Sequence, residues 1–149
     1  SATFFSLGGA FMGGFVASLL GAKRSVVLAG SLIALVWITF SRLENFWTEE
    51  WLIKTNMWIL ATLLGLFTVS LFTLFMNVSE RRVAASQLTA YMALLNLSIF
   101  AGSNIAAPLE AALPSVSTVY LACGIFHLGV MAFVILAIKP PQSPLNFQD

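Results

Sequence analysis

The sequence predicts an all-α membrane protein, a bundle of five transmembrane helices. Of its 149 residues, 59% are hydrophobic and 9% are charged, whereas soluble domains contain about 45–50% apolar and about 25% charged residues. Five segments have the roughly 20 mostly apolar residues that a helix needs to cross a bilayer. This composition excludes a water-soluble domain and a disordered chain. The formal net charge of +1 gives no basic surface for nucleic acid.

Short polar connections and turn residues bound the expected spans. Gly21 is expected to end the first helix and open a four-residue turn through Arg24. Pro108 is expected to end the fourth span and Pro140 the fifth, so that residues 140–149 form a polar tail after the bundle. The chain lacks an initiator methionine, so we expect a piece of a longer protein. The expected spans cover residues 3–20, 25–40, 55–76, 84–107 and 117–138.

Basic residues are unevenly distributed among the connections. If every span crosses, five of the seven lie on one side, and the positive-inside rule makes that side and the C-terminal tail cytoplasmic. The four tryptophans gather near the connection between the second and third spans, as an aromatic belt at the opposite interface would. We therefore expect an integral protein of a bacterial inner membrane or an organelle membrane. The five basic residues are Lys23, Arg24, Arg81, Arg82 and Lys139, and the tryptophans are Trp37, Trp47, Trp51 and Trp58.

The first span is rich in small residues. Gly9 and Gly13 form a Gly-x-x-x-Gly pair, and Gly14 lies beside them. Such a face lets two helix backbones approach closely. We expect these glycines to pack against another helix, and a sliding surface for a gating helix is the functional alternative.

The fourth span is unusually polar. At about 100° per residue, five of its polar residues share a face about 100° wide, and three others form a narrower strip. Asn96, near mid-span, is the strongest indication of a site, because an amide in hydrocarbon needs a hydrogen-bond partner or a water-lined cavity. Hydrogen bonding to another helix and contact with a substrate both fit this pattern. The broad face carries Ser86, Thr89, Asn96, Ser103 and Asn104, and the strip carries Gln87, Tyr91 and Ser98.

No residue pattern predicts catalysis or a cofactor. His127, at the centre of the fifth span, is expected to be neutral and bonded to a neighbouring helix, with a functional role as the alternative. Cys123 is the single cysteine and is expected to be a small buried hydrophobe. No Asp or Glu lies inside a span, and no Gly-rich phosphate loop is present. We therefore expect neither an enzyme nor a metal site.

The turn after the first span resembles the cytoplasmic loop motif of the major facilitator superfamily, Gly-x-x-x-Asp-Arg-x-Gly-Arg-Lys/Arg. Ser18 and Leu19 stand in place of its Asp and Arg. The motif forms a charged lock between helices on the cytoplasmic side, and without those two residues the resemblance does not imply the lock here. The residues that carry it are Gly14, Gly21, Lys23 and Arg24.

A second stretch, residues 75–104, is similar to one group of the same superfamily. Ala85-Ser86-Gln87 resembles the Ala-Thr-Gln start of this helix in bacterial muropeptide permeases. The acetyl-CoA transporters have Tyr-Met-Thr-Leu-Leu-Asn and then Gly-Gly-Asn-Trp here. The matching residues are Tyr91, Met92, Leu94, Leu95, Asn96, Gly102 and Asn104, and the departures are Ala93, Ser103 and Ile105.

The resemblance implies helices eight to twelve of a twelve-helix transporter. The first, third and fourth spans would line the central cavity, and the second and fifth would face lipid. The implied function is that of the C-terminal part of a secondary active transporter, which moves a polar solute (a muropeptide, an acyl-CoA-like or another organic molecule) by alternating access with a missing N-terminal half. The alternative is a non-transporting subunit, or an assembly or pigment-delivery factor of a larger membrane complex. The expected substrate-binding residues are Gln87, Tyr91, Asn96 and Asn104.

Overall fold

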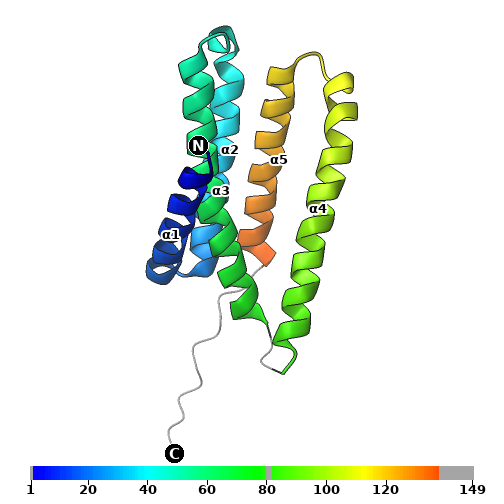
Figure 1. Cartoon of the computed structure of the whole chain (residues 1–149). Coiled ribbons are helices and arrows are strands. Elements are labelled where there is room, and N and C mark those ends of the chain that lie inside the picture. Colours follow the sequence, from blue (N-terminus) through cyan, green and yellow to red (C-terminus); the bar gives the residue numbers. More distant parts are fainter. Residues whose placement is uncertain (1, 80–81, 138–149) are drawn as a thin grey trace, which may run out of the picture.

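The computed structural model describes residues 2–79 and 82–137, which contain helices and short connections and no strand (Figure 1). A short 3₁₀ helix, η1 (Glu44–Phe46), lies between the second and third α-helices. All five α-helices are long and apolar enough to cross a membrane. This confirms the prediction of an all-α chain with five helices that can span a membrane. They are α1 (Ala2–Leu20), α2 (Ala22–Arg42), α3 (Glu50–Val78), α4 (Ala84–Ala112) and α5 (Val116–Ala137).

A single residue, Gly21, connects α1 to α2. Its φ of +82° lies in the left-handed region that glycine adopts readily. Its N–H donates to the Ala17 carbonyl and its carbonyl accepts from the Ser25 N–H, both at 3.0 Å. The expected four-residue turn is therefore wrong, because the helix resumes at once and Lys23 and Arg24 lie in the first turn of α2.

The two longest helices extend beyond their expected ends. α3 begins five residues before the expected start, and a 2.6 Å ion pair between Lys54 and Glu50 lies in its first turns. α4 continues through Pro108 to Ala112, so the expectation that this proline ends the helix is wrong. Proline removes one backbone hydrogen bond but does not have to break a membrane helix. The predicted tail, 140–149, lies outside the described residues.

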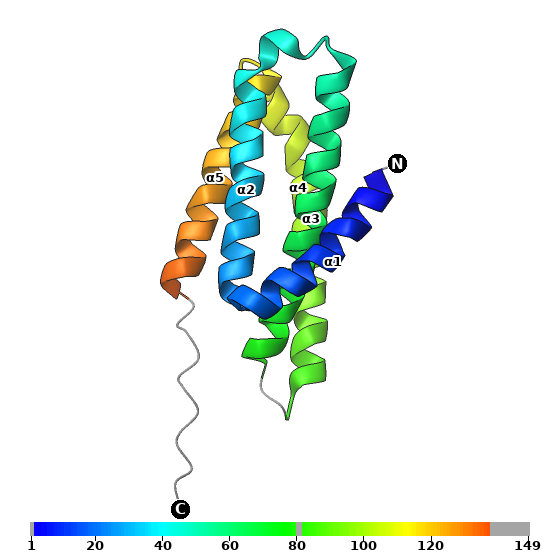
Figure 2. The same ribbon diagram turned by 90° about the vertical axis from the view of Figure 1, so that its left-hand side faces the viewer.

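α2 is the central helix of the bundle and packs against both α3 and α5 (Figure 2). Val26 packs with Leu74 of α3, and Gly30 lies against the Met131 side chain of α5. Small residues on two of its faces let both neighbours approach, while Leu28, Leu32 and Leu35 stay exposed on another face. The expectation that the second span faces lipid therefore stays a prediction. Its buried residues are Ala22, Ser25, Val26, Ala29, Gly30, Ile33, Ala34, Phe40 and Ser41.

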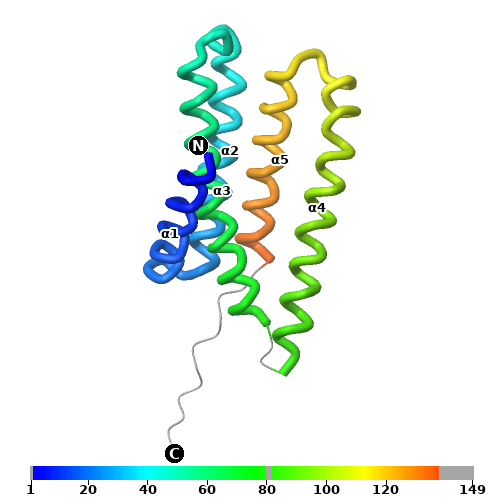
Figure 3. The backbone as a smooth tube through the Cα atoms, viewed as in Figure 1, coloured from blue at the N-terminus to red at the C-terminus, as the bar shows by residue number. Residues whose placement is uncertain are grey.

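The connections alternate between the two ends of the bundle (Figure 3). One end, here the basic end, holds Lys23, Arg24 and Arg82, where α2 and α4 begin and α5 ends. Arg81 and Lys139, predicted on the same side, lie outside the described residues. The opposite end, here the acidic end, holds Glu44, Glu49, Glu50 and Glu110 together with Arg42 and Lys54.

Candidate functional site

The predicted site lies on α4, the helix that is least integrated into the bundle. Figure 1 shows α4 at the edge of the molecule, beyond α5. None of its residues is buried by the rest of the described chain. Its half-buried residues all fall within an arc of about 100°, which marks the side of α4 that faces the other helices. They are Ala84, Gln87, Leu88, Tyr91, Leu95 and Leu109.

The four predicted binding residues divide between two sides of α4. Gln87 and Tyr91 lie on the half-buried side, where the Tyr91 ring stacks on Phe75 of α3 with centroids 4.6 Å apart. Asn96 and Asn104 are exposed and lie at least about 80° outside the half-buried arc, on the broad polar face. The structure therefore does not bring the four side chains into one site.

Three of the five polar side chains on the broad face of α4 bond to the helix itself. Thr89, Ser103 and Asn104 each donate to a main-chain carbonyl three or four residues earlier, at 2.7 to 2.9 Å. Asn96 differs, because its exposed amide makes no hydrogen bond to any residue that the structure describes. An unsatisfied polar group costs several kcal/mol in hydrocarbon. Asn96 therefore needs a partner or water from outside the described residues.

α1 crosses α3 (Figure 2), and Gly9 and Gly13 are buried against α3 at this crossing. A methyl group on Gly9 would collide with the Thr62 carbonyl, and one on Gly13 would lie 2.7 Å from the Leu66 carbonyl oxygen. Only a hydrogen at each position lets the two backbones approach this closely. The contact is of the kind that small-residue faces form between membrane helices.

The same crossing uses a third glycine, on the facing helix, that sequence reasoning missed. A methyl group on Gly65 of α3 would collide with the Ser6 carbonyl. The available signal was a glycine in the middle of a long apolar helix, which indicates a close backbone approach. Gly14 takes no part in the crossing and has open space around it, because one residue turns the helix about 100° from Gly13. The expectation that Gly14 packs with the other two is not met among the described residues.

The residues that resemble the loop motif serve separate purposes. Gly21 forms the turn, and Gly14 faces open space. Lys23 donates from Nζ to the Ile135 carbonyl in the last turn of α5, at 2.8 Å. A cation at a helix C-terminus satisfies an orphan carbonyl and complements the helix dipole. Lys23 therefore holds the end of α5 against the start of α2, with Arg24 exposed beside it.

His127 lies between aromatic rings of two other helices. Its ring centroid is 5.5 Å from that of Trp37 on α2 and 5.9 Å from that of Phe67 on α3. Its Nε2 is buried without a hydrogen-bond partner among the described residues, so the expected bond to a neighbouring helix is not seen. Cys123 is half-buried with a free thiol, and the described residues contain no group of three or more His, Cys, Asp or Glu placed to hold a metal.

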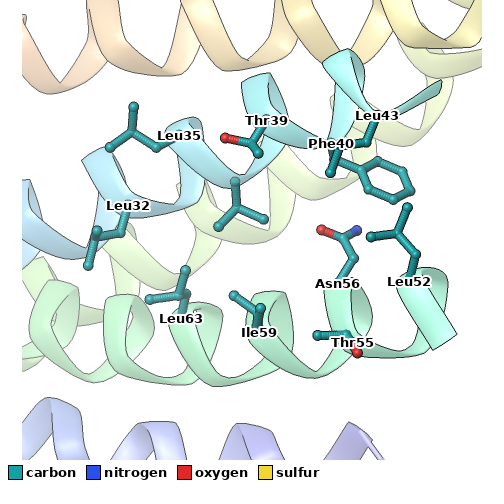
Figure 4. A pocket seen from close by; sticks show the side chains of 11 residues that line it. Leu32, Leu35, Thr39, Phe40, Leu43, Leu52, Thr55, Asn56, Ile59 and Leu63 are labelled. Carbon is teal, nitrogen blue, oxygen red and sulfur yellow. The ribbon is translucent and has the colours of Figure 1, made fainter. Parts of the chain in front are cut away.

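An apolar groove of about 420 Å³ lies between α2 and α3 near the acidic end (Figure 4). Asn56 points from α3 into the space between the helices and is half-buried without a hydrogen bond to a described residue. Sequence reasoning missed Asn56 because it lies at the edge of the expected span. An amide just inside an apolar helix was the available signal. The groove is not lined by α4 and so is separate from the predicted site.

Comparison with known proteins gives no assignment. No protein-family profile, no curated protein and no solved structure matches this chain. The resemblance to the major facilitator superfamily therefore stays a prediction.

Proposed function

We propose that this chain is an integral membrane protein and forms the C-terminal part of a major facilitator-type secondary transporter of a polar solute. Its five helices would correspond to helices eight to twelve, with the N-terminal half outside the chain. Transporters of this kind rock two helical halves around a site near the membrane midplane. The excess of basic residues at one end supports a cytoplasmic position for that end.

The observation that carries the proposal is the broad polar face of α4, which points away from the other described helices. From Thr89 to Asn104 this face extends for about 22 Å along the helix. Polar groups inside a membrane face protein or a water-filled cavity. A polar face of this length suits a water-filled path. The face would border the cavity between this chain and the missing half.

The division of the four predicted residues gives them different roles in the proposal. Asn96 would donate to or accept from the solute, because nothing described competes for its amide. Asn104 would contribute mainly its carbonyl oxygen, since its Nδ2 donates to Phe100 at 2.7 Å. Tyr91, stacked on Phe75, would instead position α4 against α3, with Gln87 on the same side.

Uptake by the complete protein in proteoliposomes tests the proposal, with radiolabelled muropeptide and acetyl-CoA as probes. For whichever probe is transported, Asn96→Leu should lower kcat/KM about tenfold, the loss expected for one hydrogen bond to a polar ligand. Ser98→Ala is the matched control. It also removes a polar group from α4, but the Ser98 hydroxyl already donates to the Leu95 carbonyl at 2.7 Å, so uptake should stay near wild type.

Equal uptake by wild type and Asn96→Leu, at equal protein levels, would remove Asn96 from the solute site. Uptake of neither probe by the wild-type complete protein, together with loss of a co-purifying membrane complex in Asn96→Leu, would favour the non-transporting subunit instead.

A further inference from the structure

The apolar groove between α2 and α3 has a more polar half and a fully apolar half (Figure 4). Its three polar lining residues, Thr39, Thr55 and Asn56, all lie in the half nearer the acidic end. Leu32 of α2 and Leu63 of α3 lie in the other half, about 10 Å further along the helices. A molecule that fills this groove should therefore have one polar end and one apolar end.

Asn56 gives the polar half a hydrogen-bonding group that no described residue satisfies. Its side chain points from α3 toward α2, is half-buried and makes no hydrogen bond to a described residue. The nearby side chains of Phe40 and Leu43 are apolar and offer no partner. An amide has an acceptor oxygen and an N–H donor group, and leaving such groups unpaired away from water costs about 1–3 kcal/mol. An occupant with both a carbonyl and a hydroxyl would satisfy both ends of this amide.

Asn56 lies near the level at which lipid headgroups meet hydrocarbon. α3 has 29 residues and is about 43 Å long, whereas the hydrocarbon core is about 30 Å thick. If α3 is centred in the membrane, about 6 Å of each end lies outside the core. Asn56 lies about 9 Å beyond the start of α3, which is just inside the core. The polar half of the groove is thus at the depth of a lipid's ester group, and the apolar half is at the depth of its acyl chain.

The charges around the groove favour an uncharged occupant. No charged residue is among those that line it. Among the described residues, the acidic end has four glutamates and two basic residues, so its field disfavours an anionic headgroup. One of the two basic residues, Lys54, is already paired with Glu50 at 2.6 Å. A phosphate would therefore have no cation in the groove to bind.

We propose that this groove binds a neutral lipid with one acyl chain and a glycerol-ester head, that is, a monoacylglycerol. Asn56 would donate from Nδ2 to the ester carbonyl and accept at Oδ1 from a glycerol hydroxyl. The chain would lie along Ile59 and Leu63 of α3 and Leu32 of α2. The groove volume of about 420 Å³ falls within the range of small-ligand pockets, about 300–1,000 Å³. The site needs the chain to lie in a membrane, but it is separate from α4 and does not depend on transport of a solute.

The test is a lipid titration of the purified complete protein, read by native mass spectrometry, with monooleoylglycerol as the probe. Asn56→Leu should weaken binding about tenfold, because the hydrogen bonds to the head are lost. Asn45→Leu is the matched control and should bind the probe like wild type. Asn45 is an exposed amide at the same end that also makes no hydrogen bond to a described residue, but it lines a different pocket.

Two further arms test the apolar half and the charge of the head. Ile59→Trp keeps Asn56 but fills the groove, and it should abolish binding. Ile59 is 44% exposed, so this variant should keep the wild-type unfolding midpoint. Lysophosphatidylglycerol with the same acyl chain has the same ester but carries a phosphate, and it should bind about threefold more weakly than monooleoylglycerol.

Four results would overturn the proposal. They are no binding of monooleoylglycerol by the wild-type complete protein, equal binding by wild type and Asn56→Leu, an equal loss in Asn56→Leu and Asn45→Leu, and equal or tighter binding of lysophosphatidylglycerol. Unchanged binding by a normally folded Ile59→Trp would overturn it as well. If Ile59→Trp does not fold, the comparison of Asn56→Leu with Asn45→Leu still decides, because neither substitution removes a hydrogen bond to a described residue.

Discussion

Helices α3 and α4 have the same length, 29 residues, and both could cross a membrane, yet only α3 is built into the described bundle. α3 buries Gly65, Leu66, Ser70 and Leu74 between α1 and α2, whereas α4 buries no residue at all. Apolar length therefore makes a helix that can span, but it does not decide what the helix packs against. In α3 the packing contacts come from Gly65 against α1 and from Ser70 against α2.

The polar side chains of the two helices show the same contrast. Ser70 of α3 is fully buried and shares a 2.6 Å hydrogen bond with Ser25 of α2. Asn96 of α4 has no such partner among the described residues. The Ser70 hydroxyl thus bonds within the bundle, whereas the Asn96 amide can bond to a group outside the described residues. Substitutions at the α3 contacts should change stability, and those on the broad face of α4 should change function.

The largest expected effect comes from filling the crossing of α1 and α3. Gly9→Leu places a side chain where a single methyl group already collides with the Thr62 carbonyl, so the free energy of unfolding should fall by about 3 kcal/mol. Equilibrium unfolding in mixed detergent micelles measures it. Gly14→Leu is the control and should change the value by less than about 0.5 kcal/mol, because Gly14 faces open space. Equal losses in the two variants would contradict the crossing.

A smaller effect is expected at the serine pair. Ser70→Ala leaves the fully buried Ser25 hydroxyl without its interhelical partner, which should cost about 1 kcal/mol. The double-mutant cycle with Ser25→Ala should give a coupling of about 0.6 kcal/mol, the average for hydrogen bonds between membrane helices. A coupling of zero in the same unfolding assay would mean that the two hydroxyls act independently.

The smallest effect on stability is expected on α4. Asn96 is exposed and its replacement by Leu removes no hydrogen bond to a described residue, so the free energy of unfolding of this chain should change by less than about 0.5 kcal/mol. A loss comparable to that of Ser70→Ala would identify Asn96 as a packing residue and would remove the contrast between the two helices.

Much of the fold could be predicted, because apolar length and turn residues are local signals. Five helices and the turn at Gly21 follow from them. The effect of Pro108 was predicted wrongly. The free-energy cost of a proline inside a helix depends on whether neighbouring groups bond to the main-chain carbonyl that it leaves without a donor, and a local sequence pattern does not show this. The start of α2 at Ala22 was missed because nothing local shows that a helix can resume after one left-handed residue.

The site could be predicted only in part. Helical periodicity separated the two polar strips of α4, and it placed Asn96 and Asn104 on the broad one. It could not say which strip faces the other helices, because that depends on contacts such as Tyr91 with Phe75. The facing glycine, Gly65, was missed for the same reason, since a close crossing is a property of two helices together.

The most direct test of whether the broad face of α4 meets water is cysteine labelling of the complete protein in native membranes. In a Cys123→Ala background, Asn96→Cys is compared with Phe133→Cys on α5. Measured from the end where α4 stops and α5 starts, Asn96 and Phe133 both lie about 25 Å along their helices, and Phe133 is 69% exposed and should face lipid. A water-soluble methanethiosulfonate needs a thiolate, so Asn96→Cys should react about tenfold faster or more. Equal rates, or no reaction at Asn96→Cys, would contradict a water-filled cavity beside α4.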